Sequence, residues 1–304
     1  MKSFVATVLC AVSFAIHASE PLSVSEIAPG VYVHTGKVEE RGPSNMGDQA
    51  NIGFIVGTRC VAVIDSGGSN IIGHRLRAAI KATTALPVCY VINTHVHPDH
   101  VFGNIAFQTE GVTFVGHERL PKAMALRAQN FGRSLVRDLG ESVAPSVMIP
   151  PTLLVKDEMT LDLGERELRL RAYPVGHSDA DVSVLDVKTQ TLWLSDLLFL
   201  DHTPAIDGSV LGWLAVTDEL KTLQVARVVP GHGPPSVPWP ASLAPQERYL
   251  RLIVDEIRTA LKKRRTIEQA VEEVGYSEQD KWREFDNFHR RNVTTSYVEL
   301  EWED

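Results

Sequence analysis

Three histidines and one aspartate lie within a single short segment, residues 94–100 with the sequence THVHPDH. The segment follows the apolar run 88–92, which is typical of a buried strand. Because side chains alternate along an extended chain, we expect His95, His97 and Asp99 to point into one cavity and His100 to begin the next element. Imidazole and carboxylate ligands together suit zinc, and also iron or manganese. The segment therefore predicts a metal site.

Two metal ions need more ligands than this segment supplies, and three later positions can complete the set. His177 follows Gly176, Asp196 ends an apolar run, and His232 has a glycine on either side. Each of the three comes directly after a stretch that is typical of a strand. We therefore expect all three at strand ends along one rim of a sheet sandwich, where the glycines around His232 allow close backbone approach.

The order H-x-H-x-D-H, then G-H, then D, then G-H resembles the pattern of the metallo-β-lactamase superfamily of dinuclear hydrolases, over about Ile27 to His232. The resemblance implies an α/β fold, a four-layer αβ/βα sandwich. It also implies two Zn²⁺ ions, with iron or manganese as other metals for the site. The seven implied ligands form two sets and one bridge: His95, His97 and His177 for the first ion, Asp99, His100 and His232 for the second, and Asp196 between them.

The implied chemistry is hydrolysis of a small-molecule substrate. One carboxylate can hold two ions roughly 3.5–4 Å apart, and a metal lowers the pKa of water from 15.7 to about 7. We therefore expect hydroxide attack on an ester, thioester, lactone or amide carbonyl, with Asp99 helping to move the proton because no separate general base is evident. Typical zinc β-lactamases have cysteine or serine where this chain has Asp196, which disfavours the alternative of a zinc β-lactamase.

Other polar residues are candidates to support the ligands or to contact substrate. In the superfamily an aspartate at the place of Asp65 orients ligating imidazoles, although a turn aspartate explains it as well. Asp179 and Asp181 follow His177, where many members have Thr-Pro-Gly, and they can contact substrate, hold His177 or serve as surface turn residues. The polar segment 37–49 is our first candidate for substrate contact, as a flap over the site; a disordered surface insertion is the alternative.

The stretch 196–213 resembles a narrower group, the exported zinc metallohydrolases associated with quinoprotein dehydrogenase and sulfur oxidation systems. On this resemblance a periplasmic quinoprotein dehydrogenase system is a candidate partner. The same stretch supplies four pocket candidates: Asp201, His202, Asp207 and Trp213. A structured loop over the core is the other interpretation.

Two further alternatives belong to other functional classes. Iron in the first site would permit oxygen-dependent sulfur chemistry, as in the persulfide dioxygenases of this superfamily. Metal analysis together with an oxygen-consumption assay distinguishes such a dioxygenase from the zinc hydrolase. A non-catalytic accessory protein of a periplasmic dehydrogenase system is disfavoured by the intact ligand set, because binding alone needs no open dinuclear site. Glyoxalase II-like thioesterases hold glutathione with C-terminal helices, but no residues here match theirs.

The elements that must position these ligands can be read from hydrophobic periodicity. Strands are predicted at 27–34, 51–57 and 60–64, followed by a helix from Asn70 with apolar residues at three- and four-residue spacing, and then the strand 88–92. This order makes a parallel unit with the metal segment at the carboxyl end of its second strand. We divide the chain into a signal peptide (1–18), a metallo-β-lactamase-like domain (19–265) and a helical C-terminal extension (266–304).

The N-terminal segment predicts export to the periplasm. Lys2, an apolar stretch too short to span a bilayer and the small residue Ala18 fit a cleaved secretory signal, with a transmembrane anchor as the alternative. No later segment is apolar enough to span, so no membrane insertion is expected after cleavage. The net charge of −8 argues against nucleic acid or an anionic membrane as partner.

Three cysteines are present, and Cys10 falls within the predicted signal. Cys60 and Cys89 lie in predicted strands and can pair in an oxidising compartment. We nevertheless expect two buried thiols, because a bridge requires a specific Cα geometry. Neither cysteine occupies a metal position.

Overall fold

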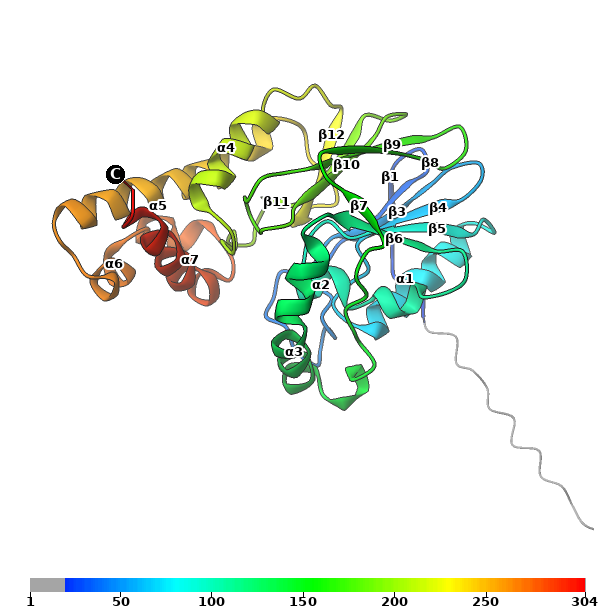
Figure 1. Cartoon of the computed structure of the whole chain (residues 1–304), viewed down its shortest axis with the longest axis horizontal. Helices are drawn as coiled ribbons and strands as arrows, with labels where there is room; N and C mark the ends of the chain where they lie inside the picture. The colour runs from blue at the N-terminus through cyan, green and yellow to red at the C-terminus, as the bar shows by residue number, and fades with distance from the viewer. Residues whose placement is uncertain (1–19, 304) are drawn as a thin grey trace, which may run out of the picture.

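The computed structural model describes residues 20–303, so the predicted signal peptide lies outside the described part. Two β-sheets pack face to face, and helices cover the outer face of each (Figure 1). None of the helices within residues 20–303 is both long enough and apolar enough to cross a membrane.

The first sheet has seven strands in the order β1 to β7. Strands β1 to β4 are antiparallel neighbours, whereas β5, β6 and β7 continue the sheet parallel to β4. The strands are β1 Ser25–Ala28, β2 Val31–His34, β3 Ile52–Val56, β4 Val61–Ile64, β5 Val88–Ile92, β6 Thr113–His117 and β7 Leu153–Val155.

The second sheet has five strands in the order β12-β11-β10-β9-β8. Its strands are antiparallel except for β12, which pairs with β11 in parallel. β8 and β9 pair as an antiparallel hairpin. The strands are β8 Glu158–Asp162, β9 Glu167–Ala172, β10 Val182–Asp186, β11 Thr191–Phe199 and β12 Arg227–His232.

The helices fall into two groups, one on each side of the sheets (Figure 1). The first group is α1 Asn70–Thr83, α2 Pro98–Val101 and α3 Leu120–Leu139, with the short 3₁₀ helices Asn104–Phe107 and Glu141–Val143. The second group is α4 Val210–Leu220, α5 Ala244–Lys262, α6 Ile267–Glu273 and α7 Phe285–Leu300, with the 3₁₀ helices Ala241–Leu243 and Tyr276–Lys281.

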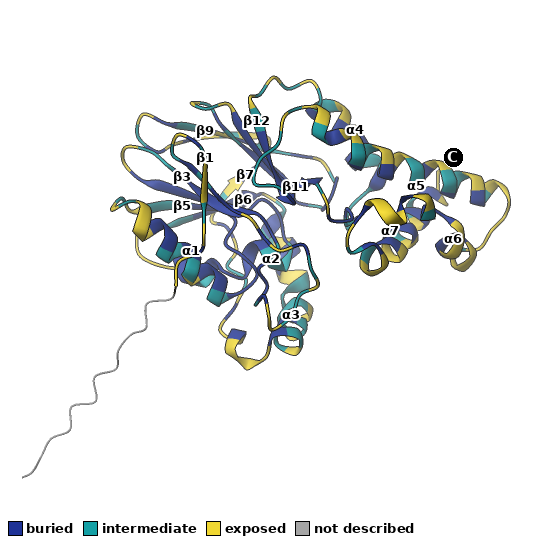
Figure 2. Ribbon diagram, turned by 180° about the vertical axis from the view of Figure 1, so that it is seen from behind, coloured by how far each residue is buried: buried dark blue, intermediate teal, exposed yellow. Residues whose placement is uncertain are grey.

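Three apolar clusters separate the layers. One lies between the sheets and includes Val31, Ile64, Leu170 and Trp193, all buried. A second packs α1 against the first sheet, and a third packs α4, α5 and α7 against the second. The strands β3, β4, β10, β11 and β12 are accordingly buried on both faces, whereas β8 and β9 leave one face partly exposed and the helices expose their outer sides (Figure 2). The predicted α/β four-layer αβ/βα sandwich is confirmed, including a helical C-terminal region.

The predicted helix after Asn70 is α1, and its position follows from its sequence. The Ser69 hydroxyl accepts a hydrogen bond from the Ile72 backbone N–H, which caps the first turn. Ile72, Leu76 and Ile80 then recur on one buried face. The helix thereby returns the chain to β5, whose carboxyl end leads into the histidine segment.

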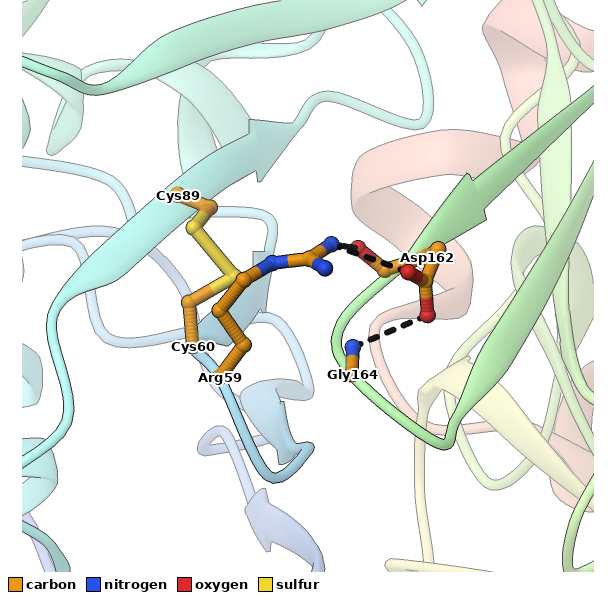
Figure 3. The surroundings of a disulfide bond; sticks show 5 residues. All are labelled: Arg59, Cys60, Cys89, Asp162 and Gly164. Atoms are coloured by element: carbon orange, nitrogen blue, oxygen red, sulfur yellow. Dashed lines mark hydrogen bonds and ion pairs between the residues drawn. A yellow bond between two sulfur atoms is a disulfide. The ribbon is translucent and has the colours of Figure 1, made fainter.

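Cys60 and Cys89 form a disulfide, so the prediction of two buried thiols was wrong (Figure 3). Their Cα atoms are 5.8 Å apart, which is the usual spacing for a bridge. The two residues meet because Cys60 immediately precedes β4 and Cys89 lies in β5, and these strands pair in parallel. Beside the bridge, the Arg59 guanidinium donates to the Asp162 carboxylate of the second sheet at 3.0 Å.

Candidate metal centre

The first group of ligand atoms comes from three separate places in the fold. His95 and His97 lie between β5 and α2, His177 lies between β9 and β10, and Asp196 lies in β11. His97 Nδ1 is 3.0 Å from both His95 Nε2 and His177 Nε2. Asp196 Oδ2 is 3.5 Å from His95 Nε2 and 3.4 Å from His177 Nε2. Four nitrogen and oxygen atoms at this spacing can share one ion, given metal–ligand distances near 2.0–2.2 Å.

The second group lies next to the first. Asp99 and His100 belong to α2, and His232 is the last residue of β12. Asp99 Oδ2 is 3.5 Å from His100 Nε2 and 3.4 Å from His232 Nε2. These three residues can hold a second ion.

Asp196 faces both groups. Its Oδ1 is 3.1 Å from His100 Nε2, while its Oδ2 approaches the first group and lies 3.5 Å from His232 Nε2. We expected Asp196 at a strand end, but β11 continues through it to Phe199, with its pairing to β12 displaced at Ser195. Ser195 has φ 49°, and such an irregularity turns the following side chain toward the site. Gly231 is needed opposite, because a side chain there would collide with Asp196 Oδ1.

Two buried polar atoms in this cluster fit a metal. His100 Nε2 and Asp196 Oδ1 are both buried and lie 3.1 Å apart, but they are not aligned for a hydrogen bond, and neither has a hydrogen-bond partner among residues 20–303. Burying such atoms unsatisfied costs about 1–3 kcal/mol each, and most buried polar atoms in native proteins have partners. A cation between the two side chains would satisfy both. The residues present therefore fit a pair of divalent ions.

Each candidate imidazole ligand is also held through its other ring nitrogen, and this fixes its orientation and tautomer. The contacts are His95 Nδ1 to Thr94 Oγ1 at 3.1 Å, His97 Nε2 to Asp207 Oδ2 at 3.2 Å, His100 Nδ1 to Asp65 Oδ2 at 2.8 Å, His177 Nδ1 to the Ala205 carbonyl at 2.7 Å, and His232 Nδ1 to the Gln49 carbonyl at 3.0 Å.

Asp65 lies at the centre of a buried polar network behind the histidine segment. Its carboxylate accepts from the Thr94 backbone N–H at 2.8 Å, from the Thr94 hydroxyl at 2.7 Å and from Ser195 Oγ at 3.2 Å. The same carboxylate holds His100. Asp65 thus joins β4, the histidine segment and β11, the three elements that carry or precede ligands.

Asp207 links His97 to two arginines on different helices. Its carboxylate is 3.5 Å from Arg127 of α3 and also pairs with Arg291 of α7. Burial opposes ionisation of Asp207, but the hydrogen bond with His97 and the two guanidinium charges prevail and hold its pKa well below the usual range. Asp207 therefore remains an anion that accepts from His97.

Electrostatics favour a neutral His177 and an ionised Asp196, whereas the pKa values of His100 and His232 are raised by neighbouring aspartates against the effect of burial, so a metal would displace protons from these two rings. Burial lowers the pKa of His177 to about 3, so its imidazole is neutral, as a ligand must be. Burial opposes ionisation of Asp196 as well, but the surrounding His100, His232 and His95 outweigh it and hold the Asp196 pKa well below its usual range.

The remaining candidates lie outside the two ligand groups. Asp181 accepts from the Ser178 backbone N–H at 2.9 Å, and so it holds the turn after His177 rather than facing the cavity. Asp179 is 3.5 Å from Arg127. His202 lines the cavity; its ring lies 4.8 Å from that of His232 and its Nδ1 is 2.6 Å from the Thr203 carbonyl.

A cavity of about 650 Å³ opens over the ligands. Its walls come from segment 37–49, from α3 and from α7. Segment 37–49 is anchored to α3, because the Arg41 guanidinium donates to Asp138 and, at 3.1 Å, to Ser134. The segment that we expected to be a flap therefore lies at the site in a defined conformation. The cavity floor is formed by four of the candidate ligands: His97, Asp99, Asp196 and His232.

The sequence profile of the metallo-beta-lactamase superfamily matches residues 45–232, more than half of the chain. The chain belongs to the metallo-beta-lactamase superfamily. All seven candidate ligands lie within the matched range, and His232 is its last residue. The comparison with curated proteins found no match.

Solved structures of metallo-beta-lactamase proteins share the fold. A metallo-beta-lactamase from Pontibacter korlensis has 22% identity and a TM-score of 0.60, over 76% of this chain and 99% of that one. The metallo-beta-lactamase FIM-1 from Pseudomonas aeruginosa, in its mono-zinc form, has 16% identity and a TM-score of 0.59, over 77% and 96%. The stereoselective inverting sec-alkylsulfatase Pisa1 from Pseudomonas sp. has 17% identity and a TM-score of 0.62, over 83% of this chain but only 45% of that one.

One part of this site, the wall formed by α7, could not be predicted from the sequence. Glu284, Asn287, Phe288 and Arg291 line the cavity from this helix. We expected only a charged helical extension there, because a helix face that lines a cavity has the same periodicity as one that covers a core. The ligands could be predicted because they lie in short sequence motifs, whereas the residues of α7 that line the cavity form no such motif.

Proposed function

We propose that the chain is an exported dinuclear zinc hydrolase that cleaves an ester, thioester, lactone or amide bond of a small molecule. The observation that carries this proposal is Asp196, which faces both ligand groups and leaves a buried oxygen unsatisfied between them. When bound, two zinc ions would supply a water of lowered pKa and polarisation of the substrate carbonyl. The mono-zinc form of the neighbour FIM-1 supports zinc as the metal.

The chain's own residues supply position and proton transfer. Asp65 and Asp207 hold His100 and His97 in the orientation that a ligand needs. Asp99 lines the cavity, and its carboxylate can accept a proton from the attacking water and return it to the leaving group. His202 and Phe199 form an aromatic wall beside the ligands that helps to exclude bulk water from the reacting bond.

Export is supported by the disulfide and by the N-terminal segment. Disulfides persist in oxidising compartments such as the periplasm, and the Cys60–Cys89 bridge suits such a location. The signal-like residues 1–18 agree with this location. The stretch 196–213 supports a setting beside a periplasmic quinoprotein dehydrogenase system, because of its resemblance to exported zinc metallohydrolases of such systems.

The decisive experiment is a hydrolysis screen on protein whose metal content has been quantified. We expect about two zinc ions per chain and turnover of ester, thioester or lactone substrates that stops when zinc is removed and returns when it is restored. Iron in the purified protein together with oxygen consumption on a persulfide would instead support the dioxygenase alternative. Turnover of nitrocefin alone would support a β-lactamase. Fully zinc-loaded protein that is inactive on the whole panel would overturn the hydrolase proposal.

A further inference from the structure

The wall formed by α7 combines an aromatic ring with a cation. Phe288 and Arg291 both line the cavity, and residues three apart lie on the same face of a helix. Their neighbours Glu284 and Asn287 are engaged with each other, since the Asn287 amide donates to the Glu284 carboxylate at 2.6 Å. Phe288 and Arg291 are therefore the residues of α7 that are free to meet a substrate.

An aromatic surface connects the ligands to Phe288. The ring of Phe199 stacks on the ring of His232 with their centroids 4.9 Å apart. The ring centroid of His202 lies 4.8 Å from that of His232. Phe288 in turn meets His202 edge to face, with ring centroids 4.6 Å apart. Apolar and aromatic cavity walls bind the apolar part of a ligand. A substrate held at the ligands can thus lay an apolar chain along His202 and Phe288.

Arg291 lies at the end of this surface with most of its donors free. Its side chain is 61% exposed, and within residues 20–303 its guanidinium has one partner, the Asp207 carboxylate. A guanidinium has five N–H donors and matches a carboxylate in a bidentate geometry. Because Asp207 also accepts from His97, Arg291 lies two hydrogen bonds from a candidate metal ligand. An anion on Arg291 would therefore be only a short chain away from the reacting carbonyl.

The other arginines of the cavity are less suited to this role. Arg41 already donates through Nε and Nη2 to Asp138, and through Nη2 to Ser134. Arg137 donates to the same Asp138 at 2.7 Å and has no contact in the described chain that leads to a candidate ligand. Arg291 alone combines free donors with the aromatic surface and the connection to His97.

Building on the proposed hydrolase, we propose that the substrate is an acyl compound with a carboxylate at the far end of an apolar acyl chain, recognised by Phe288 and Arg291. In the reaction, the oxygen of one water bonds to the acyl carbon, the bond from that carbon to the leaving oxygen or sulfur breaks, and a water proton goes to the leaving group. The carboxylate on Arg291 takes no part in the bond changes. It selects the substrate and fixes its position.

The test uses two esters that differ only at the end of the acyl chain. 4-Nitrophenyl hexanoate ends in a methyl group, and the mono-4-nitrophenyl ester of adipic acid has the same six carbons but ends in a carboxylate. With zinc-loaded protein we expect the adipate ester to have the higher kcat/KM. The substitution Arg291→Gln should lower that kcat/KM about tenfold or more, mainly through KM, because a charge-assisted bidentate contact is lost. The hexanoate value should change less than about twofold.

Arg127→Gln is the matched control. Arg127 contacts the same Asp207 at 3.5 Å but does not line the cavity. Any effect through Asp207 on His97 should therefore appear in both variants and should alter both esters by the same factor. Zinc content is measured for each protein. The assignment of Arg291 would be overturned if Arg291→Gln lowered kcat/KM equally on both esters. It would also be overturned if the preference for the adipate ester were lost in Arg137→Gln but kept in Arg291→Gln.

A binding measurement separates this proposal from the hydrolase proposal. If the zinc-loaded protein cleaves neither ester, calorimetry with 5-phenylpentanoate and the matching alcohol, 5-phenylpentan-1-ol, still tests the carboxylate site. Affinity for the acid that falls about tenfold in Arg291→Gln, with affinity for the alcohol unchanged, would support the site while the hydrolase proposal fails. Equal affinity for the acid in both proteins would place the acid elsewhere and would refute the role of Arg291.

Discussion

At the scale of single residues, the centre depends on carboxylates that each serve more than one partner. Asp196 faces both ligand groups, Asp65 joins His100 to Thr94 and Ser195, and Asp207 joins His97 to α7. Each carboxylate ties together elements that are distant in the sequence. A substitution at one of them should therefore have effects beyond its own contacts.

Asp196→Ala should reduce metal binding at both sites. The substitution removes the only side chain that reaches both ligand groups in the described structure. We expect well under two zinc ions per chain after dialysis, measured by plasma mass spectrometry, and loss of hydrolysis. Asp179→Ala is the control, because Asp179 is a carboxylate of the same region that belongs to neither ligand group. Full loading with two ions in Asp196→Ala would refute the bridging role.

Asp65→Asn should weaken zinc binding about 10–100-fold, the usual effect of removing the partner of a ligating histidine. Asn suits this position because Asp65 has φ 54°, a conformation that Asn tolerates. The amide cannot accept from His100 Nδ1 and Thr94 as a carboxylate does. Zinc affinity is measured by competition with a chelator, with Asp179→Asn in parallel. Unchanged zinc affinity in Asp65→Asn would mean that Asp65 only accepts hydrogen bonds from the surrounding chain and does not support the metal ligands.

At the scale of elements, local patterns predicted what each strand brings to the site. The histidine ligands are recognisable because they follow or end strands, and Asp196 because it is a charged residue within an apolar one. Two details could not be predicted in this way. The element that we expected to begin at His100 begins at Pro98 as the four-residue α2, and a 3₁₀ helix follows from Asn104, after Gly103, which lies against the Ser66 backbone. The displaced pairing at Ser195 depends on β12, which lies thirty residues further on.

The C-terminal helices that supply the cavity wall depend on a buried carboxylate, Glu278. It accepts from Arg248 of α5 at 2.8 Å, from Lys281 at 2.6 Å and from the Trp282 indole at 3.0 Å. Burial opposes its ionisation, but these donors prevail and lower its pKa from 4.5 to about 2. A carboxyl group whose pKa is depressed on folding stabilises the protein above its unfolded pKa, and this contribution is lost as the pH falls from about 4.5 toward 2.

Glu278→Gln should therefore lower the free energy of unfolding by about 1–3 kcal/mol at pH 7. The difference from the unsubstituted protein should shrink at pH 3, because the carboxyl group is then mostly protonated in the unfolded chain while it is still ionised in the native protein, so that unfolding takes up a proton. Urea unfolding of both proteins at pH 7 and pH 3 measures this difference in the free energy of unfolding. Glu272→Gln, which removes an exposed pair with Arg290, should change the free energy of unfolding much less and equally at both pH values, because solvent screens an exposed ion pair. A difference that stays constant between pH 7 and pH 3 would contradict the prediction.

At the scale of the whole molecule, the fold class followed from the sequence, but contacts between distant elements did not. The order of strands and helices predicts two layers of each, and the structure has them. The wall formed by α7 could not be predicted, because the periodicity of an amphipathic helix does not indicate which surface the helix packs against. The pairing of Cys60 with Cys89 depends on the parallel register of β4 and β5, which residue types alone do not determine.

The disulfide should stabilise the protein mainly by restricting the unfolded chain. It links residues 29 positions apart, for which loop-closure entropy amounts to about 3–4 kcal/mol. The double substitution Cys60→Ala with Cys89→Ala should lower the free energy of unfolding by about this amount, and it should also weaken zinc binding, because β4 leads to Asp65 and β5 to His95. Urea unfolding and chelator competition measure the two effects, and the unsubstituted protein with its disulfide reduced shows the effect of opening the bridge while both side chains remain. Peptide mapping that finds both thiols free in the native protein would remove the basis of the prediction.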